Sequence, residues 1–313
     1  MQLLSFILPI YNEQDSIPKL WEELFKLSQK LKTYQTEFIF VNDGSRDNSL
    51  AELEKIYKKF PKLIKIINFS RNFGHQIAVT AGQDIAKGDA VIIMDSDLQD
   101  PPELVLEMVV KWKEGFDIVY AQREKYKTNF FKQTSAFIFY RILKNITNVE
   151  IPVDTGDFRL VSKRVNDEMK RFKEKSKFLR GISSLTGFKQ VAVKFSRNQR
   201  FAGKPQYTFL KSLKLAMDGI TGFSVFPIHL ISIVGFIFST SSFVFGVAYI
   251  IYTIATKDNI SGWASLMSAI IFLGGVQLLM LGIIGEYLGR IYIQVLDRPL
   301  YTIDKIIESN LQD

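Results

Sequence analysis

Two aspartates, Asp95 and Asp97, stand one residue apart at the end of an apolar run, Ala90–Met94. A run of this kind is typical of a buried parallel strand, whose carboxyl end then carries both acids. Ligands bind at that edge in open α/β sheets. Two close carboxylates repel each other, and a hard divalent cation such as Mg²⁺ or Mn²⁺, bridging diphosphate oxygens, would neutralise them. Taken alone, the pair is equally consistent with a strand that runs into a polar turn.

The elements that position these acids alternate between strand and helix. The predicted strands are Leu3–Ile10, Glu37–Asn42, Ile64–Phe69, Ala90–Asp95 and Asp117–Ala121. The amphipathic helical patterns between them are Pro18–Lys32, Ser49–Phe60, Gln76–Ala86 and Pro102–Glu114. This alternation predicts an α/β fold with a mostly parallel, Rossmann-like sheet and helices on both faces.

Polar loops follow four of the predicted strands. They are Tyr11–Glu13, Asn42–Asp47, Ser70–His75 and Asp95–Asp100. The alternation brings them to one edge of the sheet, where carboxylates, amides and a cation would suit a nucleotide diphosphate. Turn chemistry can explain any single loop, because Asn, Asp, Gly and Ser dominate turns. The P-loop and G-x-G-x-x-G motifs are absent from the sequence, which disfavours the protein classes they mark.

Composition narrows the possibilities further. The net charge of +8 is compatible with nucleic acid, an anionic membrane surface or phosphate substrates. The sequence has no Cys and only 2 His, which excludes disulfides and cysteine-ligated metals and disfavours a zinc enzyme. The N-terminal apolar segment lacks a basic region and is interpreted as a strand rather than a signal peptide.

Two long uncharged windows, residues 219–256 and 259–285, predict transmembrane helices over Pro227–Tyr252 and Trp263–Tyr287. The alternative is a buried helical hairpin in a soluble protein. Basic residues flank the pair on the outer sides, and the connector carries only Lys257, beside Asp258. The positive-inside tendency therefore places both termini and the polar domain in the cytoplasm, on the inner face of the cell membrane.

The segment before the first span has an amphipathic pattern, with Leu210, Leu213 and Met217 on one helical face. It is interpreted as an interfacial helix, with an ordinary surface helix as the alternative. The predicted organisation is a polar α/β domain (1–204), an interfacial segment (205–226), a two-helix hairpin (227–289) and a C-terminal tail (290–313). Another apolar stretch, Phe130–Tyr140, is too short to span and is expected to be core or membrane-touching. Glycines in the second span allow close helix approach and favour a homo-oligomer, such as a tetramer.

Six motifs then carry a family resemblance. They are Pro9-x-Tyr11-Asn12-Glu13, Val41-Asn42-Asp43-Gly44-Ser45-x-Asp47, Arg71-Asn72-Phe73-Gly74, Asp95-x-Asp97-Leu98-Gln99-Asp100-Pro101-Pro102-Glu103, Asp154-x-Gly156-Asp157-Phe158-Arg159-Leu160 and Arg200-Phe201-Ala202-Gly203-Lys204. Over nearly its whole length the sequence resembles the inverting family 2 glycosyltransferases of GT-A fold. More narrowly, it resembles the polyprenyl-phosphate transferases related to dolichol-phosphate mannose synthase and to bacterial undecaprenyl-phosphate glucosyltransferases. It departs from them at Pro205-Gln206, where Ser-Lys is common.

The resemblance implies roles for the motif residues. The nucleotide-sugar would be held by residues from the first four motifs, namely Pro9, Tyr11, Glu13, Asp43, Arg71, Asp95 and Asp97. Asp95 and Asp97 would also hold Mg²⁺ or Mn²⁺. Asp157 would be the catalytic residue beside the acceptor, either as a base or as an orienting group. Arg200 and Lys204 would bind phosphate.

Structural roles are possible for the same residues. Glu13 could cap the first helix, and Arg71 could pair with a neighbouring carboxylate. Asp154 and Asp157 could organise a turn around Gly156. Arg200 and Lys204 could contact lipid headgroups.

The function implied by the resemblance is metal-dependent, inverting transfer of one sugar to polyprenyl phosphate at the cytoplasmic membrane face, without nucleic acid. The preferred donor is UDP-glucose or a related UDP-hexose, with GDP-mannose as the alternative. A processive polysaccharide synthase shares the fold, but a Gln-x-x-Arg-Trp motif is absent from the sequence. A nucleotide-sugar sensor without turnover is the remaining alternative.

Overall fold

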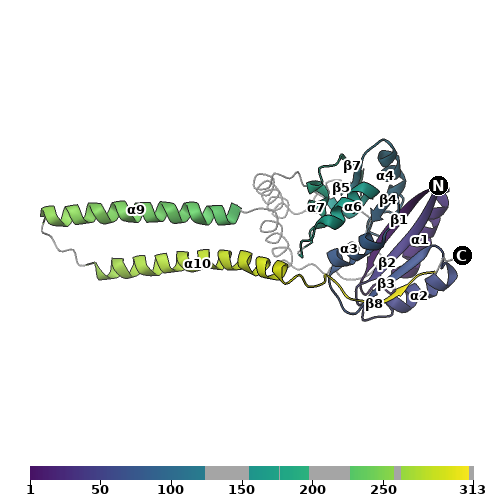
Figure 1. Ribbon diagram of the computed structural model, residues 1–313, viewed down its shortest axis with the longest axis horizontal. Helices are drawn as coiled ribbons and strands as arrows, with labels where there is room; N and C mark the ends of the chain where they lie inside the picture. The colour runs from purple at the N-terminus through teal and green to yellow at the C-terminus, as the bar shows by residue number, and fades with distance from the viewer. Residues whose placement is uncertain (124–154, 176, 197–225, 257–261, 310–313) are drawn as a thin grey trace. The chain divides into compact units, whose positions relative to one another are not determined.

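The computed structural model describes residues 1–123, 155–175, 177–196, 226–256 and 262–309. The chain divides into two compact units, Met1–Ser212 with Pro299–Asp313, and Leu213–Arg298. The first contains the sheet and the second contains the two long helices (Figure 1). The predicted interfacial segment (205–226) and the Phe130–Tyr140 helix lie outside the described residues.

The first unit is built on one sheet with the strand order β7-β5-β6-β4-β1-β2-β3-β8. Its strands are β1 (Gln2–Ile10), β2 (Tyr34–Asn42), β3 (Ile64–Phe69), β4 (Ala90–Ile93), β5 (Ile118–Arg123), β6 (Thr155–Ser162), β7 (Gln190–Phe195) and β8 (Ile303–Ile307). The pairs of β1 with β2 and β4, of β2 with β3 and of β5 with β7 are parallel. Strand β6 pairs antiparallel with β4 and β5, and β8 pairs antiparallel with β3. The predicted mostly parallel α/β fold is confirmed.

Helices cover both faces of this sheet (Figure 1). They are α1 (Ile17–Lys30), α2 (Ser49–Lys59), α3 (His75–Ile85), α4 (Leu104–Lys113), α6 (Lys163–Arg171) and α7 (Leu179–Leu185). Alternate residues of β1, such as Phe6 and Leu8, share one core with α1, α2 and α4. Residues of β2 on the other face, such as Ile39 and Val41, pack with α3. This period-2 alternation explains how both faces of one strand can be buried.

Glycine at position 82 lets α3 lie close to β1. A Cβ built on Gly82 would stand 2.4 Å from Ile7 Cγ2, a separation that packed side chains do not tolerate. The close approach holds the amino end of α3, which begins at His75, beside the carboxyl end of the central strands.

Strand β6 differs from the sequence-based expectation at the Gly156 motif. The interpretation of Asp157 as part of a turn around Gly156 is wrong, because Thr155–Ser162 is a continuous buried strand. β6 pairs with β4 over Arg159–Ser162 and with β5 at Thr155 and again from Arg159, with a bulge between, so Asp157 lies in an extended segment of the strand. Asp154 lies outside the described residues.

The C-terminal segment also differs from the expected tail. Residues of β8 extend the sheet beyond β3, so the end of the chain is part of the first unit. The strand is short and half-exposed, with no strong alternation of apolar and polar residues that would have predicted it.

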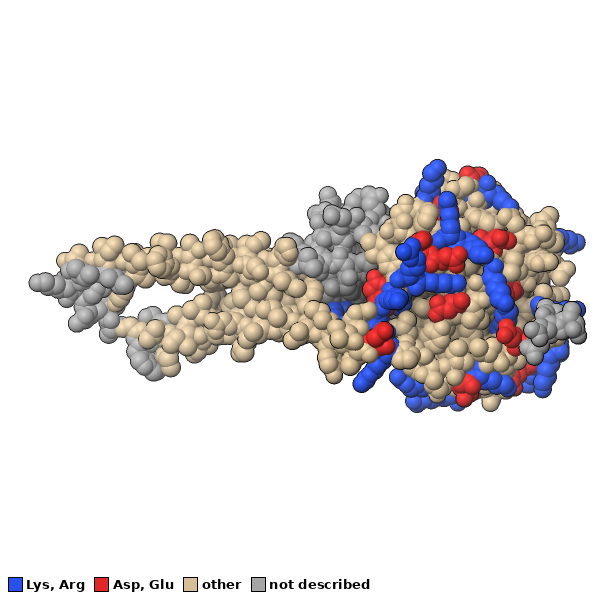
Figure 2. All heavy atoms as spheres, viewed as in Figure 1, with Lys and Arg blue, Asp and Glu red and all other residues tan. Residues whose placement is uncertain are grey.

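The second unit consists of α9 (Phe226–Thr256) and α10 (Trp263–Val295). Both contain windows, Pro227–Tyr249 and Leu266–Val295, that are long and apolar enough to cross a membrane. In Figure 2, charged side chains of both signs cover the sheet unit, whereas the described surface of α9 is uncharged. Helix α10 continues past the predicted end at Tyr287 to Val295, and Glu286 and Arg290, on either side of Tyr287, form an ion pair at 3.0 Å one turn apart.

Candidate functional site

Asp43 anchors the loop that follows β3. Its carboxylate accepts hydrogen bonds from Phe73 N at 2.7 Å, Gly74 N at 2.9 Å and Asn72 Nδ2 at 2.9 Å. The side chain is buried, and burial raises the pKa of Asp43 although the two backbone N–H groups and His75 lower it. The first structural task of Asp43 is therefore to fix this loop.

The loop closes on β2 through a glycine. Gly44 has φ +61, and a Cβ at this position would stand 2.3 Å from the carbonyl carbon of Arg71. Both the left-handed backbone and the close approach require glycine here. The motifs around Asp43 and Arg71, separate in the sequence, thus form one packed unit.

Arg71 is exposed on this loop, and its guanidinium lies 4.1 Å from the centre of the Phe73 ring. Among the described residues no carboxylate lies within ion-pair distance of Arg71, so the alternative of a structural salt bridge does not hold there. Stacking on Phe73 holds the exposed guanidinium in place.

The motif after β1 lies beside the same loops. Pro9 is in β1 opposite Val41, and Tyr11 follows the strand end. Glu13 N donates to Ser49 Oγ at 2.9 Å, and Glu13 Oε2 accepts from Ser16 Oγ at 2.7 Å. Ser16 is the residue before α1, so Glu13 does support the start of that helix.

Asp95 and Asp97 follow β4, as predicted. Asp97 is buried and its Oδ1 accepts from Gln99 N at 3.1 Å, which shapes a turn. Asp95 Oδ1 is buried without a hydrogen bond in the described part of the chain, and His75 Nε2 lies 3.5 Å away. Burial raises the pKa of Asp95, and the nearby Asp157 and Asp97 carboxylates add to the rise, whereas His75 opposes it.

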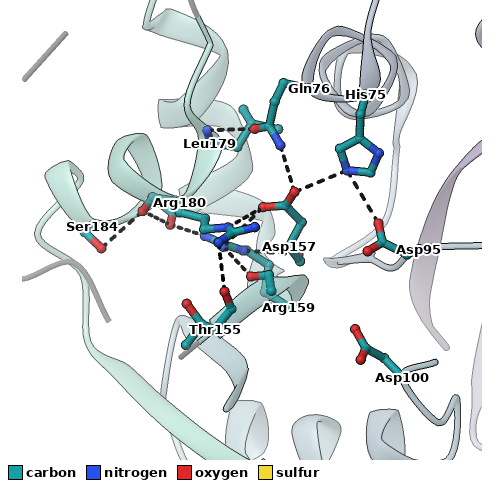
Figure 3. Close-up of polar contacts among 12 residues, drawn as sticks. His75, Gln76, Asp95, Asp100, Thr155, Asp157, Arg159, Leu179, Arg180 and Ser184 are labelled. Atoms are coloured by element: carbon teal, nitrogen blue, oxygen red, sulfur yellow. Dashed lines mark hydrogen bonds and ion pairs between the residues drawn. The ribbon is translucent and has the colours of Figure 1, made fainter. Parts of the chain in front are cut away.

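Asp157 lies in β6 among donors from two other elements, α3 and α7 (Figure 3). Arg180 Nε donates to its Oδ1 at 2.8 Å. Gln76 Nε2 donates to its Oδ2 at 2.7 Å, and His75 Nε2 lies 3.2 Å from the same oxygen. Arg159 Nη2 adds a further cation at 4.0 Å.

The partners of Asp157 are themselves held in place. Arg180 Nη1 donates to Thr155 O at 2.9 Å, and Gln76 Oε1 accepts from Leu179 N at 3.0 Å. Arg159 is buried and donates to the carbonyl oxygens of Gly156 and Asp157. Each donor therefore has a second contact that fixes its direction.

These charges decide how the cluster is protonated. Burial raises the pKa of Asp157, but Arg180, His75 and Arg159 together hold it well below its usual value. Burial lowers the pKa of His75, but the Asp157 and Asp95 carboxylates raise it to about 9. Near neutral pH the cluster therefore contains an anionic Asp157 and a cationic His75 that joins Asp157 to Asp95.

The residues fit a divalent cation that shares its coordination with a substrate. Among the described residues, no group of three or more His, Cys, Asp and Glu side chains is arranged to hold a metal alone. Asp95 and Asp97 offer hard oxygen ligands at one strand end. Asp95 Oδ1 is buried and lacks a hydrogen bond in the described part of the chain, and a bound cation would share it with the 3.5 Å ion pair to His75. Mg²⁺ is commonly bound by one or two carboxylates together with phosphate oxygens and water, which this arrangement permits.

Four members of this cluster had no assigned role in the sequence analysis: His75, Gln76, Arg159 and Arg180. The first two directly follow the loop 70–74, and their position after a strand was the available signal. Arg180 had no such signal, because it lies in the short helix α7 and reaches Asp157 only through the fold. Arg200 and Lys204 lie outside the described residues.

Comparison with known proteins agrees with this arrangement. The family model described as glycosyl transferase family 2 matches residues 5–170, which is more than half of the chain. The protein belongs to glycosyltransferase family 2. A second model, the GtrB C-terminal hairpin, matches residues 233–291 of this glycosyltransferase. The predicted enzyme class is confirmed.

Curated relatives of this glycosyltransferase match along nearly its whole length. An uncharacterized glycosyltransferase YkcC of Bacillus subtilis is 48% identical, covering 96% of this chain and 93% of its own. A bactoprenol glucosyl transferase of Shigella phage SfII is 38% identical, covering 98% and 99%. Among solved structures, Staphylococcus aureus TarS 1-349 with UDP-GlcNAc aligns at a TM-score of 0.47 and 15% identity, covering 71% of this chain and 66% of that chain.

Proposed function

We propose that this glycosyltransferase moves a single hexose, glucose from UDP-glucose, to polyprenyl phosphate at the cytoplasmic face of the membrane. Two observations support the proposal together. The cluster of Asp95, His75 and Asp157 joins the strand end assigned to the donor to the acid proposed to lie beside the acceptor. Relatives that match end to end, hairpin included, are named bactoprenol glucosyl transferases.

The donor is proposed to lie against the loops after β1, β2 and β3. The face of Tyr11, the loop held by Asp43 and the exposed guanidinium of Arg71 offer an aromatic surface, polar backbone and a cation. These are groups that a nucleoside and a diphosphate require. Asp95 and Asp97 are proposed to hold Mg²⁺ or Mn²⁺, which would stabilise negative charge on the departing diphosphate.

In the proposed transfer, an acceptor phosphate oxygen attacks the anomeric carbon opposite the donor diphosphate. The new carbon–oxygen bond forms as the old one breaks, and the electron pair leaves with the diphosphate, so the configuration inverts. A phosphate monoester has a second pKa of about 6, so the attacking oxygen is already ionised near neutral pH. The step therefore needs no proton acceptor.

Asp157 is accordingly proposed to act as a fixed anion rather than a base. Its low pKa and its contacts with Arg180, Gln76 and His75 make it a poor proton acceptor. A buried, preorganised anion stabilises positive charge that develops at the anomeric carbon in the transition state. Arg200 and Lys204 are proposed to bind acceptor or diphosphate oxygens.

The direct test is turnover by the purified full chain in detergent, with Mn²⁺ or Mg²⁺, undecaprenyl phosphate and a panel of donors. We expect a lipid product whose mass corresponds to one hexose, formed from UDP-glucose and not from GDP-mannose. Asp97→Asn should abolish it, and Lys305→Ala, an exposed change on β8, should not. Product from GDP-mannose alone would overturn the assignment of UDP-glucose as donor. A ladder of product masses would indicate a processive synthase. Binding of the nucleotide-sugar without release of the nucleoside diphosphate would indicate a sensor.

A further inference from the structure

The segment after α10 returns to the sheet and packs against the strand that leads to the proposed donor loop. β8 runs antiparallel beside β3, with Ile67 opposite Ile306 and Phe69 opposite Ile303. Figure 1 shows this yellow strand next to the blue β3, although more than two hundred residues separate them in the sequence. Ser70 N, the first residue after β3, donates to Thr302 O at 3.1 Å.

Tyr301 secures the aromatic residues at the base of the loop. Its ring stacks on Phe69 with centroids 5.1 Å apart, and Phe69 meets Phe73 edge-on at 5.5 Å. The Tyr301 hydroxyl donates to Asp84 Oδ2 of α3 at 2.8 Å. Burial and the Asp84 carboxylate raise the pKa of Tyr301 above its usual value, so the hydroxyl keeps its proton and remains a donor.

Asp304 secures the ends of two strands through side chains. Its Oδ2 accepts from Asn68 Nδ2 at 2.9 Å, and Asn68 Oδ1 accepts from Asn42 Nδ2 at 2.7 Å. Asn42 directly precedes Asp43, the carboxylate that holds the loop 72–74. Both Asn42 and Asn68 are buried, so this relay is shielded from competing water.

We propose that Tyr301 and Asp304 are positioning residues for the nucleotide of the donor, acting through Phe73 and Asp43. The proposal rests on the proposed function, which assigns the loop 70–74 to the donor. Nucleotide binding to a mobile loop must restrict that loop, and the restriction weakens affinity. Contacts from β8 restrict it beforehand, so donor affinity depends on residues that follow the second long helix.

The test is the affinity of the full chain in detergent for UDP with Mn²⁺, measured by titration calorimetry together with steady-state kinetics. We expect Tyr301→Leu and Asp304→Ala to raise the Kd for UDP and the KM for the donor about tenfold, the value of a lost hydrogen bond or stacking contact. The acceptor KM and the kcat at saturating donor should stay within about twofold, because Tyr301 and Asp304 affect donor binding and not the transfer step. Lys305→Ala is the matched control, since this exposed lysine on the same strand pairs only with Glu54 in the described part of the chain.

Conservative variants separate positioning from loss of folding. Tyr301→Phe keeps the ring on Phe69, and Asp304→Asn keeps an acceptor for Asn68, so both should fold and recover most of the UDP affinity. Unchanged UDP affinity in folded Tyr301→Leu and Asp304→Ala would overturn the inference, as would a lower kcat with unchanged donor binding. If Tyr301→Leu does not fold, unchanged affinity in Asp304→Ala overturns it. Failure of the unaltered protein to bind any nucleotide would instead count against the proposed function.

Discussion

At the residue level, the carboxylate of Asp157 is the most tightly held polar group in the described cluster. One oxygen contacts Arg180 of α7, and the other contacts Gln76 and His75 at the start of α3. A carboxylate in such surroundings stays ionised, because protonation would leave buried cations without their counter-charge. Its charge rather than its basicity is therefore available for chemistry.

Asp157→Asn removes that charge and keeps the shape of the side chain. We expect kcat to fall by about 10²–10³, the usual cost of removing a preorganised electrostatic group. The rate of the unaltered enzyme should decline below about pH 6 as the acceptor phosphate gains a proton, and the residual rate of Asp157→Asn should show the same decline. Kinetics across this pH range make the comparison, with the exposed Asp167→Asn as the control. Disappearance of the acidic decline in Asp157→Asn would identify Asp157 as a base.

Arg180 and Asp157 should behave as a unit. Arg180→Gln leaves Asp157 without its closest cation and also breaks the contact with Thr155 O. We expect this variant to lose about 10²-fold in kcat and the double variant with Asp157→Asn to lose little more, because the two changes remove one arrangement. A double-mutant cycle measures the coupling, and additive losses would show that the two residues act independently. Arg171→Gln, an exposed change on α6, is the control.

At the level of elements, β1, β2 and β3 are linked by a buried polar cluster far from the loops of the site. Glu37 in β2 accepts from Ser5 Oγ in β1 and pairs with Lys65 Nζ in β3 at 2.9 Å. The backbone N–H of Lys87 also donates to it at 3.1 Å. Burial raises the pKa of Glu37, but these three partners outweigh burial and lower it below the ordinary value.

A lowered pKa of the folded state makes Glu37 a stabilising group at neutral pH. Its contribution is present above the ordinary glutamate pKa and is lost as the pH falls through the lower pKa of the folded protein. We expect Glu37→Gln to lower the free energy of unfolding by about 1–3 kcal/mol near neutral pH. The difference from the unaltered protein should shrink as the pH falls below the ordinary glutamate pKa of about 4.3. Thermal unfolding in detergent measures this, with Glu52→Gln at an exposed ion pair as the control; a difference that does not change with pH would contradict the assignment.

At the level of the whole molecule, the chain combines a charged α/β unit with a pair of apolar helices. The net charge of +8 is compatible with an anionic membrane surface, and the spans over Pro227–Tyr249 and Leu266–Val295 suit a bilayer core. A polyprenyl phosphate cannot leave the bilayer with ease, so an enzyme that uses it benefits from being held there.

The absence of Cys from the sequence allows topology to be tested directly. A single cysteine at Ser261, in the connector between α9 and α10, should react with a membrane-impermeant maleimide added to intact cells. A cysteine at Asp167, exposed on α6, should react only after the cells are permeabilised. The expectation follows from the basic residues on the outer flanks of the two helices. Labelling of both sites, or of Asp167→Cys alone, in intact cells would contradict the proposed orientation.

The sequence by itself determined the features that depend on local pattern. Alternating apolar periods predicted the first five strands and the helices between them, and the uncharged windows predicted α9 and α10. The position of Asp95 and Asp97 after a buried strand was also readable, because a strand and its following turn are contiguous.

Only the tertiary structure decided which side chains meet. Gln76 contacts Asp157 across 81 positions of sequence, and Arg180 contacts it across 23. These contacts depend on the strand order, which inserts β6 between β5 and β4 and so brings Asp157 next to the end of β4. In the same way, β8 joins β3 from the far end of the chain, although its five residues do not alternate between apolar and polar side chains. Local periodicity fixes which face of an element is buried, but the pairing of distant strands depends on the free energy of the whole sheet. The charge state of Asp157 is a product of that pairing, and no segment of the sequence contains it alone.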